Sequence, residues 1–374
     1  MFLALKEMKQ SKARFIMIGA IIMLIAWLVF ILSGLGNGLS TLSAATMKNL
    51  DADYFVYEEG TEGKIMKTKV SADLQAEIQA LDNVKATSPF GQSTVVVFKK
   101  GENEKTATKE DIAFLGVEAG GFIEPTVVEG TQLNPSNLNG VLVNDTLKDE
   151  GYKLGDTIKI TSSNIEVEII GFVNNETFNH LPVMFANLEL WQSYAFAAPG
   201  SDNGLTNPVN AIAIQGSKVD AEAMQKQLDG VEVITHSEAV MGMPGYKEES
   251  GTIYLMLAFL MVISAVIITV FFYVFILQKT QQFGVMKAIG ASNRFIKKSI
   301  ISQVFVLSLI SIIAGIILTY LTALALPPAM PFNLDMKIVI LYAAILLLLS
   351  VLGSVLSARQ VTKIDPLTAI GRVE

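Results

Sequence analysis

Four long stretches of the chain contain no Asp, Glu, Lys or Arg. They are residues 15–47, 252–277, 300–326 and 338–358. About 20 apolar residues, each rising ~1.5 Å along a helix, cross the ~30 Å hydrocarbon core of a bilayer. A buried helix of a soluble protein can also be apolar on all sides, but rarely over this length in four separate places. The pattern therefore predicts four membrane-spanning helices.

The polar segment 48–251 separates the first two stretches and alternates strand-like with helix-like patterns. Clusters of Val, Ile, Phe and Tyr predict strands at 53–57, 94–99, 157–161, 165–173 and 210–215. Periodic apolar positions predict helices at 71–81, with Ser71 as the cap, at 146–150 and at 221–228. Pro and Asn cluster at 130–140 and favour a boundary between two lobes there. The predicted fold class is thus a polytopic α-helical membrane protein with an α+β domain between its first and second spans.

The remaining segments are short. Residues 1–14 are typical of an amphipathic helix on the inner membrane surface, and residues 327–337 form a short loop between spans three and four. Residues 278–299 lie between spans two and three, and residues 359–374 form a tail. At residues 241–251, Pro and Gly favour a joint between the large domain and the second span rather than a continuous helix.

The distribution of charge gives the orientation. The two termini and the segment between spans two and three carry 12 basic and 3 acidic residues, whereas the rest carries 16 basic and 32 acidic residues. Positive charge favours the cytoplasmic side of a membrane, so both termini are expected inside and residues 48–251 outside. Residues 15–293 contain no arginine, and the outward domain is acidic, which argues against nucleic-acid binding.

Several kinds of chemistry are excluded or disfavoured. The chain has no cysteine, no Walker A sequence and no Gly-x-Ser-x-Gly motif. His180 and His236 lack the neighbouring ligands of a zinc site. Because the spans carry no charge, ion coupling through a carboxylate within the membrane is also disfavoured. We expect no enzyme activity, no intrinsic cofactor, and either an apolar substrate or one that does not cross between the helices.

Two motifs resemble a known family. Residues 281–292, QQFGVMKAIGAS, and residues 358–370, ARQVTKIDPLTAI, are similar to signatures of the FtsX/MacB-type ABC transporter permeases. Residues 140–173 also resemble the family's outward domain, and one span, a large domain and three further spans match its topology. Two positions depart from the family pattern, which usually has an acidic residue at Gln282 and often one near Gln303.

The resemblance implies a homodimer in a bacterial cell membrane, with two ATPase subunits at the cytoplasmic face that bind ATP and magnesium. It further implies that residues 278–299 form a coupling helix and that the ATP-driven stroke is mechanical. The basic, amphipathic pattern of this segment agrees. The candidate contacts with the ATPase are Phe283, Gly284, Val285, Met286, Lys287, Gly290 and Arg294. A loop that only sets the topology is the alternative.

The first 15 residues and the joint Met-Pro-Gly-Tyr-x-x-Glu resemble the haem-exporting branch of the family. Haem dissolves in bilayers, and its iron accepts Tyr, Met, His or carboxylate ligands. The candidate haem ligands are Met241, Met243, Tyr246, Glu248 and Glu249. A flexible acidic joint with a tyrosine at the membrane interface is the alternative for these residues. For the substrate, the alternatives are export of an antimicrobial peptide, a drug or a lipid-linked molecule, or a signalling scaffold that activates a cell-wall hydrolase.

Overall fold

The computed structural model describes residues 12–327 and 330–361. These residues form two compact units, one from residues 12–39, 250–327 and 330–361 and the other from residues 40–249. The predicted amphipathic helix at 1–14 and the motif at 358–370 lie mostly outside the described residues.

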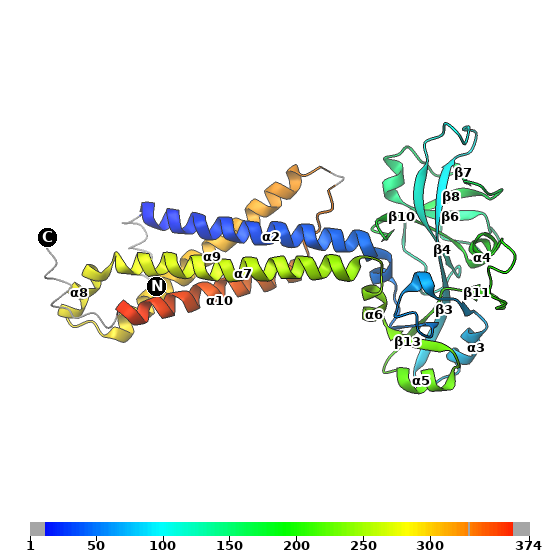
Figure 1. Ribbon diagram of the computed structural model, residues 1–374. Coiled ribbons are helices and arrows are strands. Elements are labelled where there is room, and N and C mark those ends of the chain that lie inside the picture. Colours follow the sequence, from blue (N-terminus) through cyan, green and yellow to red (C-terminus); the bar gives the residue numbers. More distant parts are fainter. Residues whose placement is uncertain (1–11, 328–329, 362–374) are drawn as a thin grey trace. The chain divides into compact units, whose positions relative to one another are not determined.

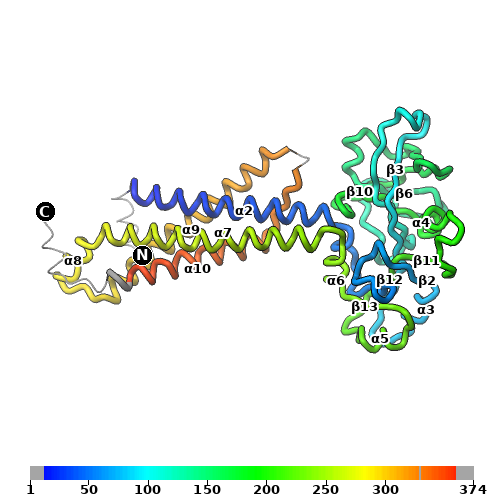
Figure 2. The backbone as a smooth tube through the Cα atoms, viewed as in Figure 1, coloured from blue at the N-terminus to red at the C-terminus, as the bar shows by residue number. Residues whose placement is uncertain are grey.

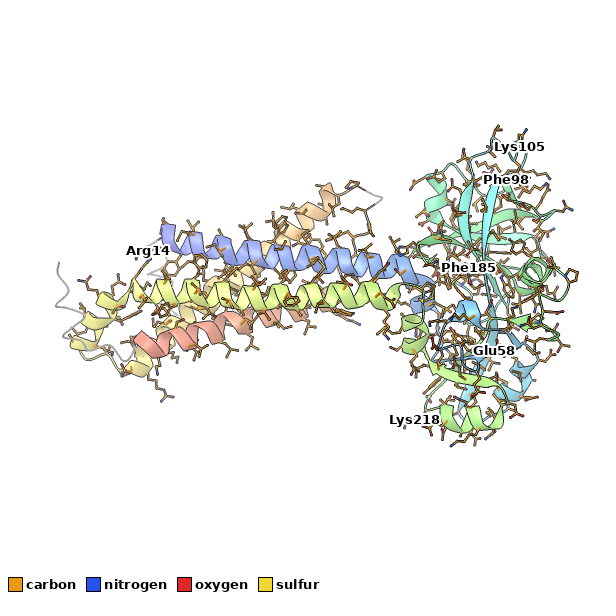
Figure 3. The ribbon with its side chains drawn as sticks, in the orientation of Figure 1. Arg14, Glu58, Phe98, Lys105, Phe185 and Lys218 are labelled. Atoms are coloured by element: carbon orange, nitrogen blue, oxygen red, sulfur yellow. The ribbon has the colours of Figure 1, made fainter. Side chains whose placement is uncertain are left out.

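The first unit is a bundle of long apolar helices, which confirms the predicted helical membrane part. Its long helices are α2 (Lys12–Asn49), α7 (Tyr246–Leu277), α9 (Asn293–Ala325) and α10 (Met336–Val361). Each is long and apolar enough to span a membrane. Within this unit the four helices run side by side, and Arg14 lies at the start of α2 (Figures 1 and 3).

A small residue lets two of these helices approach closely. A β-carbon added at Gly315 of α9 would lie 2.9 Å from Cβ of Ala26 and 3.0 Å from the carbonyl oxygen of Met23, both on α2. Lipid is as apolar as the side chains of these helices, so the hydrophobic effect does not hold helices together in a membrane. Close van der Waals packing at small residues stabilises the pair instead. Nearby, Nε1 of Trp27 donates a hydrogen bond to Oγ1 of Thr322 at 3.0 Å.

The segment between α7 and α9 differs from the single helix expected over 278–299. Helix α8 (Thr280–Ala288) ends before Gly290, whose φ of 97° lies in the left-handed region that glycine adopts readily. A new helix then begins at Asn293, capped by the hydroxyl of Ser292, which accepts a hydrogen bond from the amide of Phe295. The segment is therefore a short helix and a turn that leads directly into α9.

The second unit is built on one large sheet whose strand order is β13-β1-β12-β3-β4-β10-β6-β8-β5. The strands are β1 (Tyr54–Glu58), β3 (Val84–Lys99), β4 (Glu110–Val117), β5 (Val127–Gly130), β6 (Gly140–Asn144), β7 (Thr157–Ile160), β8 (Glu166–Val173), β9 (Thr177–Phe178), β10 (Leu181–Asn187), β12 (Ala211–Gly216) and β13 (Val231–Thr235). β2 (Val70–Ser71) and β11 (Pro208–Val209) form a separate pair. Two pairs in the large sheet, β10 with β4 and β6 with β8, are parallel. The 16-residue strand β3 pairs with β12 and then with β4, and so joins the two ends of the sheet (Figure 2).

Both faces of this sheet are buried, and successive residues alternate between them. Along β1, Val56 packs into one core, whereas Phe55 and Tyr57 pack into the other. The first core is covered by α3 (Leu74–Gln79), α4 (Leu188–Ala195) and α5 (Ala221–Gln227). The second core contains Phe185 and is covered by the end of α2 and by α6 (His236–Met241) (Figure 3). This mixed α and β domain confirms the predicted fold class.

Local details differ from the sequence predictions. Ser71 lies in strand β2 rather than capping a helix, and the capping position of α3 is Asp73. The helix expected at 146–150 is a 3-10 turn at Asp145–Lys148. The strand expected at 94–99 is the second half of β3, whose first half contains Pro89 and Gly91. At the expected lobe boundary of 130–140, β5 and β6 both pair with β8, so the sheet is continuous there.

Candidate functional site

Helix α2 is interrupted at Ala44, where φ is −147° and ψ is 24°. Carbonyl groups in the turn before an interruption need hydrogen-bond donors from elsewhere. Nζ of Lys48 donates to the carbonyl of Ser40 at 3.2 Å. The β9–β10 hairpin supplies three further donors: Oγ1 of Thr177 to Thr41 (3.0 Å), the amide of His180 to Leu42 (3.0 Å) and the amide of Asn179 to Ser43 (2.9 Å). The hairpin therefore holds the interrupted end of the helix.

The turn of this hairpin consists of Asn179 and His180, with φ values of 51° and 64°. Two-residue hairpin turns of this kind need positive φ at both central positions, and Asn and His are among the residues that tolerate it best. The turn brings Nε2 of His180 to 3.2 Å from Oγ of Ser43 and 3.1 Å from Oε1 of Glu249. Oγ of Ser43 also donates to Oε2 of Glu249 at 2.5 Å. Ser43 is fully buried, and Glu249 lies in the first turn of α7.

Ser, His and Glu are also the residue types of a hydrolase triad, but their geometry here differs. In a triad, the serine and the acid contact different nitrogens of the histidine, so that the acid orients the ring while the serine gives up its proton. In this protein Ser43 and Glu249 both contact Nε2 of His180, and Ser43 donates to the carboxylate. The cluster joins three segments of the chain and lacks the arrangement of a nucleophile.

Tyr246 lies one turn before Glu249 on α7 and is half-buried against the second core of the sheet. Nζ of Lys48 lies 4.8 Å from the centre of its ring, within the range of a cation–π interaction. The same ammonium donates to Oγ of Ser40 at 2.7 Å. The structure thus brings Tyr246 and Glu249 together, next to the end of α2.

The other three candidate ligands lie elsewhere. Met243 is 2% exposed and belongs to the second core, so it is not accessible. Met241 is 48% exposed, and Glu248 is also exposed. All three line a cavity of about 950 Å³, together with residues of 62–67 and of β13. The five residues therefore do not form one site, and among the described residues no three His, Asp or Glu side chains gather as a metal site.

A buried carboxyl group lies close to the interrupted helix. Glu176 is 7% exposed, and Nδ2 of Asn49 donates to its Oε1 at 3.0 Å. Burial raises the pKa of this carboxyl group, because the charged form loses its hydration, although the hydrogen bond from Asn49 partly opposes the effect. Sequence reasoning did not single out Glu176, because an isolated glutamate in a polar segment is usually exposed.

The predicted ATPase-contact residues in the helical unit differ in how exposed they are. Phe283 and Gly284 are buried, and Phe283 packs in the core of the bundle, so Phe283 is not available to insert into another protein. Val285, Gly290 and Arg294 are exposed, whereas Met286 and Lys287 are half-buried. Sequence reasoning missed Ile289, whose side chain is 81% exposed. An isoleucine three residues after Met286 on an amphipathic helix resembles a core position, and the turn at Gly290 exposes it.

Lys279, between α7 and α8, was also missed. Its side chain is 3% exposed, and Nζ lies 5.0 Å from the ring centre of Phe15 and 4.7 Å from that of Phe275. Nζ also donates to Oε1 of Gln303 on α9 at 3.1 Å. A buried lysine needs such partners, because an uncompensated charge is costly away from water. Lys279 therefore connects α2, α7 and α9 at the base of α8.

Together these features define a class of protein: a multi-pass membrane protein with a large folded domain between its first two spans. Two family models match the chain. The MacB-like periplasmic core domain matches residues 15–231, and the FtsX-like permease C-terminal domain matches residues 254–366. The chain belongs to the FtsX/MacB-type ABC transporter permeases. Such a permease lacks an ATPase domain and works with ATPase subunits, and its large domain is extracytoplasmic.

Full-length relatives are similar to this chain. A protein of Staphylococcus haemolyticus named "Putative hemin transport system permease protein HrtB" is 26% identical over 374 residues, which cover 100% of both chains. An uncharacterized ABC transporter permease of Mycobacterium tuberculosis is 27% identical over 375 residues, which cover 99% of both chains. The solved periplasmic region of MacB from Actinobacillus actinomycetemcomitans has a TM-score of 0.37 and 10% identity, and the match covers 52% of this chain and 94% of that one.

Proposed function

We propose that this chain is the permease subunit of an ABC exporter that extrudes haem from the membrane, driven by ATP hydrolysis on a separate ATPase. In this proposal a second copy of the chain and two ATPase subunits complete the complex. It lies in a bacterial cell membrane, with both termini in the cytoplasm and residues 48–251 outside. The names of the staphylococcal hemin transport permeases, which match this chain over 99–100% of their length, support haem as the substrate.

The observation that carries the proposal is the pairing of Tyr246 with Glu249 on one face of α7. Residues three apart on a helix are neighbours, and a phenolate and a carboxylate are both ligands for ferric iron. The ammonium of Lys48 beside the ring of Tyr246 would offset part of the negative charge of an iron-bound phenolate. The spans carry no charge, which agrees with a bilayer-soluble substrate. Met241, Met243 and Glu248 lie on the cavity and are not part of this pair.

The hydrogen bonds of Glu249 suggest how binding is linked to movement. Both of its carboxylate oxygens are occupied, one by His180 and the other by Ser43. To contact haem iron, Glu249 has to release at least one of these partners. Release would loosen the connection between the end of α2 and the start of α7, the two helices that lead into spans one and two. Haem binding and the mechanical stroke would then act on the same joint.

At the other end of the helical unit, we propose that the ATPase contacts the exposed side chains around α8. These are Val285 and Ile289, with Met286 at the edge and Lys287 and Arg294 as the basic groups. A few apolar side chains surrounded by charged ones are typical of the energetically important centre of an interface. Gly290 provides the turn that exposes Ile289, and Gly284 lies on the buried side of α8.

Hemin titration of the full-length protein in nanodiscs tests the substrate. We expect a shift of the Soret band when hemin binds to the wild type. Y246F/E249Q should bind hemin at least about tenfold more weakly, because losing a contact at a metal site changes affinity on this scale. The matched control is Y254F, because Tyr254 lies on the same helix and is 63% exposed. Two results together would overturn the proposal: no Soret shift with the purified wild-type protein, and normal hemin tolerance of a strain from which the gene is deleted. Sensitivity of that mutant to a peptide or drug, or a hydrolase crosslinked to residues 48–251, would favour the alternatives.

A further inference from the structure

A second feature of the outward domain, separate from the Tyr246–Glu249 pair, is the cavity of about 950 Å³. This volume lies at the upper end of the range for pockets that hold drug-sized ligands. Three segments form its walls: residues 62–67, part of β13, and residues 238–248 from α6 to the start of α7. Because the last wall leads directly into α7, the cavity adjoins the second span along the chain.

Most of the acidic groups in the walls already have partners. Oε1 of Glu232 accepts hydrogen bonds from Oγ1 of Thr61 at 2.7 Å and from the amide of Gly63 at 3.0 Å. Oε2 of Glu238 accepts from the amide and the hydroxyl of Thr235, both at 2.8 Å, as part of a capping box. Glu62 forms an ion pair with Lys64. Glu232 and Glu238 are therefore engaged within the walls, whereas Glu62 forms an exposed ion pair within its own segment.

The groups that remain available have a different character. Met66 and Met241 line the cavity from two different segments of the chain and are 50% and 48% exposed. Lys67 and Lys247 line the same cavity, are exposed, and form no ion pair with any residue that the structure describes. The exposed groups of the cavity therefore include two thioethers, two ammonium groups and the carboxylate of Glu248. Methionine thioethers ligate haem iron, and lysine ammonium groups bind carboxylates.

We propose that this cavity is a second haem site, in which Met66 or Met241 ligates the iron and Lys67 and Lys247 bind the two propionates. This inference rests on the proposed function, since it takes haem as the substrate. The site would receive haem after it leaves Tyr246 and Glu249 and before it is released outside. Thioether and phenolate ligands give haem iron different spectra, so spectroscopy can distinguish the two sites.

The test is hemin titration of the full-length protein in nanodiscs, followed by optical and near-infrared magnetic circular dichroism. We expect two binding components in the wild type, one with the charge-transfer signature of methionine–iron ligation. M66L/M241L, which conserves side-chain volume, should lose that component or weaken it about tenfold or more. K67Q/K247Q should weaken the same component without changing its spectrum. The matched controls are M224L, at a buried methionine outside the cavity, and K218Q, at an exposed lysine just before α5 (Figure 3).

The outcomes separate the two proposals. If M66L/M241L keeps the wild-type titration and spectrum, the cavity is not a haem site, whatever happens at Tyr246. If Y246F/E249Q loses one component while the methionine component persists, both proposals are supported. If the methionine component persists and Y246F/E249Q changes nothing, the cavity proposal is supported and the assignment of Tyr246 and Glu249 fails. A wild-type protein that binds no hemin overturns both. Thermal unfolding of each variant checks that it is folded.

Discussion

Nε2 of His180 lies 3.1 Å from Oε1 of Glu249, although the two residues are 69 positions apart in the sequence. One residue lies at the turn of the β9–β10 hairpin, and the other lies in the first turn of α7. The hairpin also supplies hydrogen bonds to the carbonyls of Leu42 and Ser43 in α2. This one contact therefore belongs to a joint that connects the hairpin, the end of α2 and the start of α7.

Changing His180 to alanine should affect coupling more than stability. The side chains of His180 and Glu249 are 41% and 34% exposed, so solvent screens their contact. We expect a cost of about 1–2 kcal/mol in the free energy of unfolding, part of it from placing alanine at a positive φ. We expect a larger fractional loss of haem-stimulated ATPase activity in the reconstituted complex. H236A is the control, because His236 contacts Met47 instead. An unchanged stimulation in H180A would show that the joint does not transmit the stroke.

Glu176 should make stability fall as the pH rises. Burial raises the pKa of its carboxyl group in the folded state above the unfolded value. The folded state therefore holds the proton over a pH range in which the unfolded state has released it. Stability is complete below the unfolded pKa and is lost as the pH rises through the folded pKa. E176Q should remove this part of the pH dependence and should be more stable than wild type at alkaline pH. Thermal unfolding of the full chain from about pH 4 to about pH 9, where carboxyl and histidine groups titrate, measures this pH dependence. Equal slopes for the two proteins would contradict the prediction.

Lys279 and Gln303 should be energetically coupled. Two aromatic rings and an amide oxygen surround the buried ammonium of Lys279, and each stabilises its charge. A desolvated cation–π contact contributes about 2 kcal/mol. We expect K279M to destabilise the helical unit by about 2–3 kcal/mol, because the cation–π contacts and the charged hydrogen bond to Gln303 are lost. In a double-mutant cycle with Q303L, the coupling should be about 1 kcal/mol. K298M, at an exposed lysine on α9, is the control. Additive effects of K279M and Q303L would argue against the coupling.

A side chain at Gly315 should separate α2 from α9. Its β-carbon would lie within 3.0 Å of atoms of Ala26 and Met23, too close for an ordinary contact. We expect G315V to cost about 1–3 kcal/mol or to prevent folding, as overpacking does. Gly251 is the matched control, since nothing lies within 4 Å of a β-carbon there. G251A should be neutral or slightly stabilising. Thermal unfolding and expression in membranes measure both, and equal effects of the two substitutions would contradict the packing argument.

Ile289 should be required for binding the ATPase. An apolar side chain that is 81% exposed beside Val285 is suited to a pocket on a partner. We expect I289E to reduce recovery of the ATPase with the permease by about tenfold or more, because central interface residues contribute at least ~2 kcal/mol. Q281E, at an exposed position on the same helix, is the control. Normal recovery with I289E would exclude this surface as the docking site.

The sequence was sufficient for the elements with a long or regular pattern. Four uncharged stretches predicted the spanning helices, because a bilayer excludes charge over a fixed length. Alternation in residues 157–161 and 165–173 predicted β7 and β8. It did not predict β4 or β10, which are buried on both faces and so lack alternation. Pro89 and Gly91 also hid the first half of β3, since both usually mark the end of a strand.

The sequence by itself determined that the chain spans a membrane four times, carries a folded domain after the first span and has two motifs of an ABC permease. These features depend on residues that are close together in the chain. Only the tertiary structure decided that Glu249 bonds to Ser43 and His180, that Met243 is buried, and that Met66 and Met241 line one cavity. The reason is physical: these contacts join segments separated by up to 206 residues, and the folding of the sheet, which no local pattern records, brings them together.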